Sequence, residues 1–176
     1  MKILIVSDLH GSTSSSEKII SLDEVFHFKK IILLGDVNYS GARNVPPEDY
    51  FPINVTKNLN KIIKKIVFIR GNCDSRVDEF VFNKKFANKK CVIVDGHHWF
   101  LTHGDLYFED NFEYKDGDAF IYGHTHVYKL EKHNNHYFIN PGSLSLPKEN
   151  NPKTYIIYED GVFSLYDIND KKIKSL

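Results

Sequence analysis

The chain has 176 residues, of which 41% are hydrophobic and 26% are charged, and its 23 basic and 23 acidic side chains give a formal net charge of zero. These fractions are typical of a globular domain and exclude a collagen, a coiled coil and a wholly disordered chain. The balanced charge argues against binding to long nucleic acid, because proteins that bind it usually carry a strong basic excess.

Short apolar runs alternate with helical patterns in the first part of the chain. Strands are predicted at 2–6, 30–34 and 65–70, because each run is short, bounded by turn-forming residues and nearly continuous in apolar character. The spacing of apolar residues predicts helices over 15–28 and 53–65. This alternation implies right-handed βαβ units with parallel strands.

Strands follow one another more closely in the second half of the chain. Six further apolar runs predict strands at 91–94, 99–102, 119–122, 136–139, 154–158 and 162–166. Asp160 and Gly161 form a favourable hairpin turn between the last two. We therefore expect a layered α/β domain whose second half adds antiparallel or mixed strands.

Residues 38–52 form the longest irregular stretch and contain three prolines. Loops of this length are uncommon unless they have a function. The sequence leaves three roles open for this loop: a surface loop packed by its own tyrosines, control of substrate access, or a dimer contact.

The domain organisation and location follow from length and from the start of the chain. We predict one domain over residues 1–176, since one domain is the default at this length. No apolar stretch approaches the roughly 20 residues of a transmembrane helix. The first apolar run is broken by Ser7 and Asp8, which is too early for a signal peptide. Cys73 and Cys91 do not make a disulfide framework. We expect a cytoplasmic protein without a membrane partner.

Polar residues follow five of the predicted strands. They are Asp8 and His10, then Asp36, then Asn72 with Cys73 and Asp74, then His103, and finally His124 and His126. Ligands bind at the carboxyl ends of strands in open α/β sheets, so we expect these five strand ends to converge.

The spacing of these residues supports convergence. Asp8 and His10 are two residues apart, as are His124 and His126, and residues at that spacing point the same way in an extended backbone. The glycines before Asp36, Asn72 and His124 allow the backbone to approach closely in a crowded site.

The donor set consists of two carboxylates, one amide oxygen and four imidazoles. Such mixed oxygen and nitrogen donors suit Mn, Fe, Zn, Ni or Co, whereas Mg or Ca would favour oxygen alone. Seven ligands are too many for one tetrahedral metal, but with one bridging carboxylate they supply four contacts to each of two. Two such ions hold a nucleophilic hydroxide and clamp a phosphoryl group. Taken alone, Asp8 is often a helix N-cap and His103 a structural histidine; their joint occurrence at strand ends favours the metal site.

The ordered motifs SDLHG, LLGDV, RGNCD, THGD, YGHTHV and NPGSLSLP resemble the calcineurin-like metallophosphoesterase superfamily over residues 1–147. The resemblance is closest to the short bacterial and archaeal branch of small phosphodiesterases, the YfcE type. It implies a layered β-sandwich of mixed sheets flanked by helices, with a dinuclear metal site at the strand ends.

The resemblance also implies roles for individual residues. One metal would be held by four ligands, Asp8, His10, Asp36 and His126. The other would be held by Asp36 as the bridging ligand together with Asn72, His103 and His124. Asn72 would also contact the substrate phosphate.

Two residues next to Asn72, Cys73 and Asp74, bear on the identity of the general acid and on the orientation of the ligands. Many larger members of the superfamily have histidine where this chain has Cys73, so the identity of the general acid stays open. Cys73 either contacts phosphate or merely fills space. Asp74 would orient a neighbouring ligand, and Ser143 would support the site.

We predict a metal-dependent phosphodiesterase that hydrolyses a small phosphodiester through a hydroxide bridging two divalent ions, with manganese favoured. The absent histidine favours diesters, although a phosphomonoesterase or nucleotidase would use the same site. The non-enzymatic alternative is a scaffold like the retromer subunit of this fold. In such a scaffold some metal-ligand residues would be expected to be lost, and none is lost in this sequence. The substrate is the expected partner, and both a homodimer and a homotetramer stay open.

Overall fold

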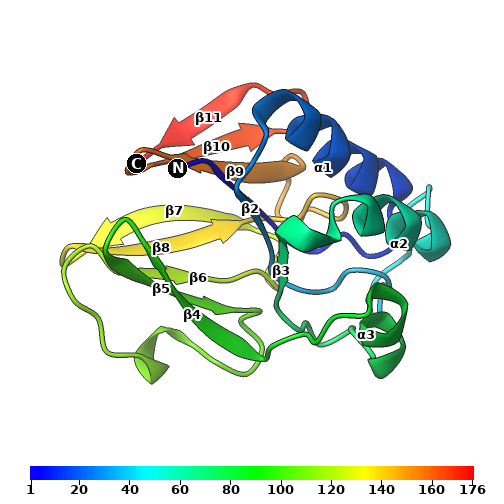
Figure 1. Ribbon diagram of the computed structural model, residues 1–176, viewed down its shortest axis with the longest axis horizontal. Coiled ribbons are helices and arrows are strands. Elements are labelled where there is room, and N and C mark those ends of the chain that lie inside the picture. The colour runs from blue at the N-terminus through cyan, green and yellow to red at the C-terminus, as the bar shows by residue number, and fades with distance from the viewer.

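Two β-sheets and three α-helices beside them make up the fold in the computed structural model, which describes residues 1–176 (Figure 1). One sheet has six strands in the order β11-β10-β9-β1-β2-β3, and the other has five in the order β4-β5-β6-β8-β7. Each sheet contains both parallel and antiparallel neighbours. The predicted α/β class, with mixed sheets flanked by helices, is confirmed.

The first part of the chain forms the two predicted βαβ units. Strand β1 pairs in parallel with β2, and β2 pairs in parallel with β3. The elements are β1 (Ile3–Val6), α1 (Thr13–Phe26), β2 (Lys30–Leu33), α2 (Pro52–Lys61) and β3 (Ile66–Phe68). The second predicted helix is too long, because α2 ends at Lys61 and a short 3₁₀ helix, η1 (Ile63–Lys65), leads into β3.

Most of the second half consists of strands. Its elements are α3 (Arg76–Phe82), β4 (Lys89–Val94), β5 (His97–Thr102), η2 (Glu109–Asn111), β6 (Ala119–Ile121), β7 (Tyr128–His133), β8 (His136–Pro141), β9 (Thr154–Glu159), β10 (Val162–Asp167) and β11 (Lys172–Ser175). The predicted hairpin turn at Asp160 and Gly161 joins β9 to β10, and both residues have positive φ. The predicted irregular loop after β2 carries no helix or strand until α2.

One α-helix and two strands were not predicted from the sequence. Helix α3 begins with a capping box, in which the backbone N–H and the side-chain hydroxyl of Ser75 both donate to Asp78 Oδ2. That Ser-x-x-Asp spacing is a start signal that could have been used. Strand β7 buries only Leu130, and β11 is exposed throughout, so neither shows the apolar run of a core strand.

Side chains on alternate positions of β1 enter two different parts of the core. Leu4 and Val6 pack with residues of α1 and α2, whereas Ile3 and Ile5 pack with residues of the five-stranded sheet. The six-stranded sheet is therefore covered by helices on one face and by the other sheet on the other, which explains the continuous apolar runs. The helices are all too short or too polar to span a lipid bilayer.

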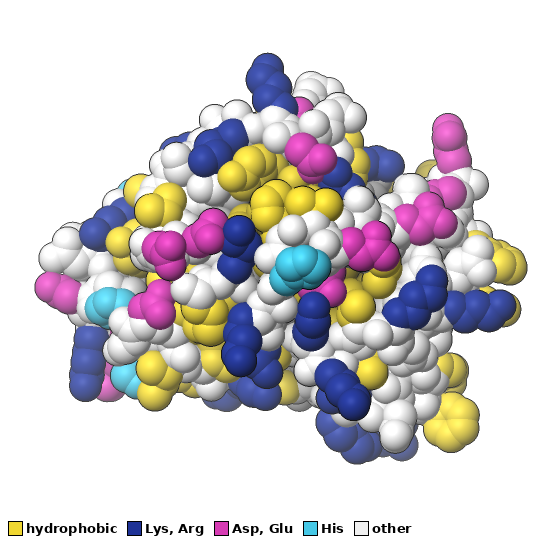
Figure 2. Space-filling model, turned by 45° about the horizontal axis from the view of Figure 1, so that its top comes forward, with side chains coloured by type: hydrophobic (Ala, Val, Ile, Leu, Met, Phe, Trp, Pro, Cys, Tyr) yellow, Lys and Arg dark blue, Asp and Glu magenta, His cyan; other side chains and the backbone are white.

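The surface carries charges of both signs. On the face seen in Figure 2, basic and acidic side chains are interspersed, and apolar side chains lie between them in small groups.

Candidate metal centre

The carboxyl ends of five strands meet at the junction of the two sheets. Asp8 and His10 follow β1, and Asp36 and Asn72 follow β2 and β3 of the six-stranded sheet. His103 follows β5 and the pair His124 and His126 follows β6, both from the five-stranded sheet. Contacts between these side chains, given below, show that the structure brings all seven residues together, as the strand-end argument predicts.

Five of the seven residues have left-handed backbone conformations. The φ angles are 56° at Asp8, 46° at His10, 53° at Asp36, 65° at His124 and 61° at His126. The expectation that the two pairs point inward from extended backbone is therefore wrong. Non-glycine residues adopt this conformation uncommonly and at a cost, and such strain clusters at functional sites. Tight left-handed turns aim these side chains, while the pairing of the strands positions the turns.

Three of the histidines are oriented by backbone carbonyls. His10 Nδ1 lies 2.9 Å from the Tyr39 carbonyl oxygen, and His103 Nδ1 lies 2.7 Å from that of Leu34. His126 Nδ1 makes the same kind of contact with Leu146. A neutral imidazole that donates from Nδ1 keeps its lone pair on Nε2, and in all three rings Nε2 faces the carboxylates.

Two buried carboxylates lie among these nitrogens. Asp8 Oδ1 is 3.3 Å from His126 Nε2 and 3.7 Å from His10 Nε2, and it has no hydrogen-bond partner although it is buried. Asp36 Oδ2 is 3.7 Å from His10 Nε2 and 3.5 Å from His103 Nε2. An orphaned carboxylate oxygen among imidazole lone pairs fits bound divalent cations, for which all of these atoms are suitable ligands.

The ligand atoms have the spacing that a metal ion requires. Within 4.8 Å of one another lie the donors of Asp8, His10 and His126, and likewise those of Asp8, Asp36 and His103. Asp8 belongs to both groups, and Asp36 of the second group also approaches His10 of the first, so both carboxylates lie where a bridging ligand could be placed.

The carboxylates and imidazoles of this cluster shift one another's pKa values. Burial raises the pKa of Asp8, but the imidazoles of His10 and His126 outweigh it, and the net shift is downward. Burial lowers the pKa of His103, but Asp36 and Asp8 outweigh it and raise the pKa to about 9. Metal ligation requires neutral imidazole, so a bound metal would replace these protons.

Asn72 and His124 lie at the more open side of the cluster. Asn72 Oδ1 is 3.2 Å from His103 Nε2, and His124 Nδ1 is 3.3 Å from the same nitrogen. The backbone N–H of His124 donates to Asp8 Oδ2 at 3.1 Å. These contacts join the end of β6 to the ends of β1, β3 and β5.

Asp74 fixes the backbone around Asp36. Its Oδ2 accepts the N–H groups of Asp36 and Gly71 at 2.9 and 2.8 Å, and its Oδ1 accepts that of Val37 at 2.8 Å. Burial and the nearby Asp36 carboxylate raise the pKa of Asp74 to about 7, while the N–H donors act in the opposite direction. Asp74 therefore touches no candidate ligand atom directly and orients Asp36 instead.

Cys73 lies against Asp36. Its backbone N–H donates to Asp36 Oδ1 at 2.8 Å, and its sulfur accepts a hydrogen bond from Asn72 at 3.2 Å. Burial and the Asp36 carboxylate raise the pKa of the Cys73 thiol to about 12. The sulfur also lies within ligand distance of donors from His10 and Asp36, a placement that sequence reasoning did not anticipate.

The loop after β8 supports the site by binding the backbone carbonyl of Asp8. Ser143 Oγ donates to the Asp8 carbonyl oxygen at 2.8 Å, and Ser145 Oγ donates to the same oxygen at 2.9 Å. The supporting place of Ser143 agrees with the sequence argument. Ser145 was missed, although its spacing of two residues from Ser143 was a usable signal.

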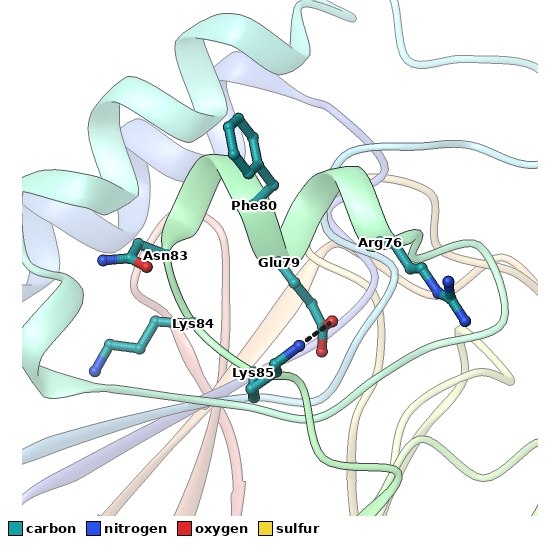
Figure 3. A pocket seen from close by; sticks show the side chains of 6 residues that line it. All are labelled: Arg76, Glu79, Phe80, Asn83, Lys84 and Lys85. Atoms are coloured by element: carbon teal, nitrogen blue, oxygen red, sulfur yellow. Dashed lines mark ion pairs between the residues drawn. The ribbon is translucent and has the colours of Figure 1, made fainter.

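A cavity of about 410 Å³ opens above the cluster. Its lining contains no hydrophobic residue and consists of Asp36, Arg43, Asn44, Asn72, His124, Thr125, His126 and Lys148. Sequence reasoning did not single out Arg43, Asn44 or Lys148. A larger cavity, of about 540 Å³, lies beside α3, where Glu79 pairs with Lys85 (Figure 3). It includes none of the candidate ligands.

Comparisons with known proteins agree with this arrangement. The family model described as "Calcineurin-like phosphoesterase superfamily domain" matches residues 1–160. Phosphodiesterase YfcE of Escherichia coli is 36% identical over 175 residues, covering 98% of this chain and 95% of that relative.

Solved structures extend the comparison. A structure of YfcE, described as a phosphoesterase from E. coli, matches with a TM-score of 0.96 at 34% identity, covering 100% of this chain and 98% of that one. Vps29 from Entamoeba histolytica matches with a TM-score of 0.67 at 17% identity, covering 100% and 97%, which shows a shared fold alone. The family acts through divalent metal ions on phosphate esters, and this chain, an enzyme of the phosphoesterase class, belongs to the calcineurin-like phosphoesterase superfamily.

Proposed function

We propose that the protein is a phosphodiesterase that hydrolyses small phosphodiesters at a site for two divalent metal ions. The observation that carries this proposal is the buried, unpartnered Oδ1 of Asp8 among imidazole nitrogens whose opposite ring atoms are held by carbonyls. Such a set of donors is built to be completed by cations. The relative named as a phosphodiesterase, at 36% identity over nearly the full chain, supports the diester preference.

Each metal would have four ligands. One would be held by Asp8, His10, Asp36 and His126, and the other by Asp36, Asn72, His103 and His124. Two divalent ions held there would supply the hydroxide nucleophile and neutralise the phosphate oxygens, with manganese the favoured metal and Zn, Fe, Ni or Co the alternatives.

The protein's own groups would prepare the site for this chemistry. Asp74 holds the turn that carries Asp36, and the two serines after β8 hold the carbonyl of Asp8. Asn72 presents its amide at the open side of the cluster, where it would contact the substrate phosphate. Cys73 brings no cationic acid to the leaving group, so esters whose leaving groups need little protonation would react best.

Metal-stripped protein provides the decisive test. We expect Mn²⁺ to restore hydrolysis of bis(p-nitrophenyl) phosphate, and the diester to be cleaved faster than p-nitrophenyl phosphate. Zn²⁺, Fe²⁺, Ni²⁺ and Co²⁺ should be compared in the same assay. Asn72→Ala and His103→Ala should each lower the diester rate by about 100-fold or more, because each removes a metal ligand. His133→Ala is the matched control, since His133 is exposed and pairs only with Glu131.

The alternatives give different results. Faster cleavage of the monoester would favour a phosphomonoesterase or nucleotidase on the same site. Metal binding without turnover of either ester would favour the scaffold, and full activity of Asn72→Ala or His103→Ala would contradict the ligand assignment. The cytoplasmic location, the single domain and self-association stay predictions.

A further inference from the structure

The cavity above the metal centre contains two cations that the proposed function does not use. Arg43 comes from the long loop between β2 and α2, and Lys148 comes from the loop between β8 and β9. Both line the same cavity as Asp36, Asn72, His124 and His126. Two loops far apart in the sequence therefore place a guanidinium and an ammonium beside the candidate metal ligands.

Neither cation has a partner within the protein. Ion pairs are formed by some of the lysines and arginines, namely Lys2, Lys18, Lys65, Arg70, Lys85 and Lys129. Arg43 and Lys148 form none. Neither side chain donates a hydrogen bond to another residue, whereas Lys174, for example, donates to a carbonyl. Both charged groups are therefore free to meet a ligand in the cavity.

The two loops that carry the cations both contact the metal centre. The N–H of Lys148 donates to the carbonyl of His126 at 3.2 Å, and the Lys148 carbonyl accepts the Asn151 side chain at 2.8 Å. On the other side, Asn44 donates to the Ser40 carbonyl at 2.8 Å. The same loop also contacts His10 through the Tyr39 carbonyl. The Lys148 backbone is thus bonded to a candidate ligand residue, and the loop that carries Arg43 contacts another candidate ligand at Tyr39, four residues before Arg43.

The number of charges indicates what these residues bind. A phosphodiester carries one negative charge at the reacting phosphorus, and in the proposed function that charge is met by the divalent ions. Arginine and lysine are the side chains best suited to a further phosphate group. A cavity of about 410 Å³ without a hydrophobic lining residue also suits a hydrated anionic group better than a nucleobase.

We propose that Arg43 and Lys148 form a second anion subsite, which binds a phosphate group of the substrate other than the one that is hydrolysed. This inference rests on the proposed function and narrows it: the preferred substrate is a small phosphodiester that carries an additional phosphate. Arg43 and Lys148 would then select substrates by the charge of the additional phosphate and not by the identity of a nucleobase.

Two substrates with the same leaving group test the subsite. They are thymidine 5′-(p-nitrophenyl phosphate) and its 3′-phosphorylated form, which differ by one phosphate. With Mn²⁺, kcat/KM should be about tenfold higher for the phosphorylated form, because a charge-assisted contact contributes on this order. Arg43→Gln and Lys148→Met should each remove most of that preference, mainly by raising KM, with a smaller effect on the plain diester.

Binding gives a readout that does not depend on turnover. Calorimetric titration of the Mn²⁺-loaded protein with thymidine 3′,5′-bisphosphate should show an affinity about tenfold lower for each variant than for the wild type. Arg76→Gln and Lys153→Met are matched controls, because neither residue lines this cavity, and both should keep the wild-type preference and affinity.

Three results would overturn the inference. Equal losses on both substrates would place the cations on the scissile phosphate, and wild-type kcat/KM on both substrates in the variants would leave the cations without a role. Equal kcat/KM for the two substrates in the wild type would remove the preference itself. In all three cases Mn²⁺-dependent cleavage of the plain diester would persist, whereas its absence in the wild type would contradict the proposed function instead.

Discussion

The Nε2 atoms of His10 and His126 lie 3.1 Å apart in the buried centre of the site, while Nδ1 of each ring contacts a backbone carbonyl. If both rings are neutral and donate from Nδ1, two lone pairs face each other with Asp8 Oδ1 beside them. That arrangement is repulsive unless a cation lies among these atoms. A proton or a metal ion relieves this repulsion, and the two compete for the same place.

Metal binding should therefore stabilise the fold. A ligand at about 100 times its Kd adds about 2.7 kcal/mol to the free energy of unfolding. A chain of this size gains about 2–4 °C in Tm per kcal/mol, so saturating Mn²⁺ should raise Tm by about 5–10 °C. His126→Ala should reduce this rise and lower the bound Mn²⁺, measured by elemental analysis, from two ions per chain. The exposed His133→Ala should retain both. An unchanged Tm rise in His126→Ala would contradict its role as a ligand.

Asp74 should control metal affinity without touching metal. Asp74→Ala leaves the N–H groups of Asp36, Val37 and Gly71 without their acceptor, which should cost about 3 kcal/mol or more of unfolding free energy. Mn²⁺ affinity should fall by about 10–100-fold, since Asp36 loses its support. Urea unfolding and metal titration measure the two effects. Asp160→Asn, at an exposed terminal pair, should change neither. Wild-type Mn²⁺ affinity in the destabilised Asp74→Ala protein would restrict Asp74 to a structural role.

The convergence of the candidate ligands was predictable from the sequence, because parallel pairing of the strands brings their carboxyl ends together. Asp8, Asp36 and Asn72 each follow an apolar run in a βαβ repeat, and parallel neighbours place their carboxyl ends at one edge. His103 and the pair after β6 come from the second sheet, where β5 and β6 are also parallel. Local patterns therefore sufficed to say which residues meet.

The details that depend on tertiary contacts were not predictable in this way. The left-handed backbone at His10 and His126 contradicts the extended geometry that the i, i+2 spacing suggests, because crowded turns between two sheets decide it. Strand β7 buries only Leu130 and is formed by pairing with β8 rather than by its own apolar pattern. Lys148 lies 22 residues beyond His126, and only the folded loop carries it back to the cavity.

Gly71 should be irreplaceable because of close approach rather than backbone conformation. A Cβ atom there would lie 2.1 Å from Asp36 Oδ1 and 2.5 Å from the Asp36 nitrogen, so Gly71→Ala must displace the Asp36 carboxylate. We expect loss of Mn²⁺ binding and of diester hydrolysis. Gly96→Ala is the control: a Cβ there meets nothing within 4 Å, and its positive φ should cost only about 1 kcal/mol of stability. Mn²⁺ binding by Gly71→Ala with wild-type affinity would show that Asp36 is not needed where it lies.

Asp118 should make the stability of the protein sensitive to acid at a place remote from the metal centre. This buried carboxylate accepts the backbone N–H groups of His98 at 2.7 Å and Lys115 at 2.8 Å, joining β5 to the start of β6. Burial raises its pKa, but these hydrogen bonds and the His98 ring outweigh it, so the net pKa lies below the ordinary value of 3.8. A lowered folded-state pKa stabilises the protein above the unfolded-state value, and this contribution is lost as pH falls through the folded-state value. Asp118→Asn should therefore be less stable than the wild type at neutral pH, and the difference should shrink below about pH 4, as followed by urea unfolding. A difference that stays constant into acid would mean that packing, and not the ionised carboxylate, is what Asp118 contributes.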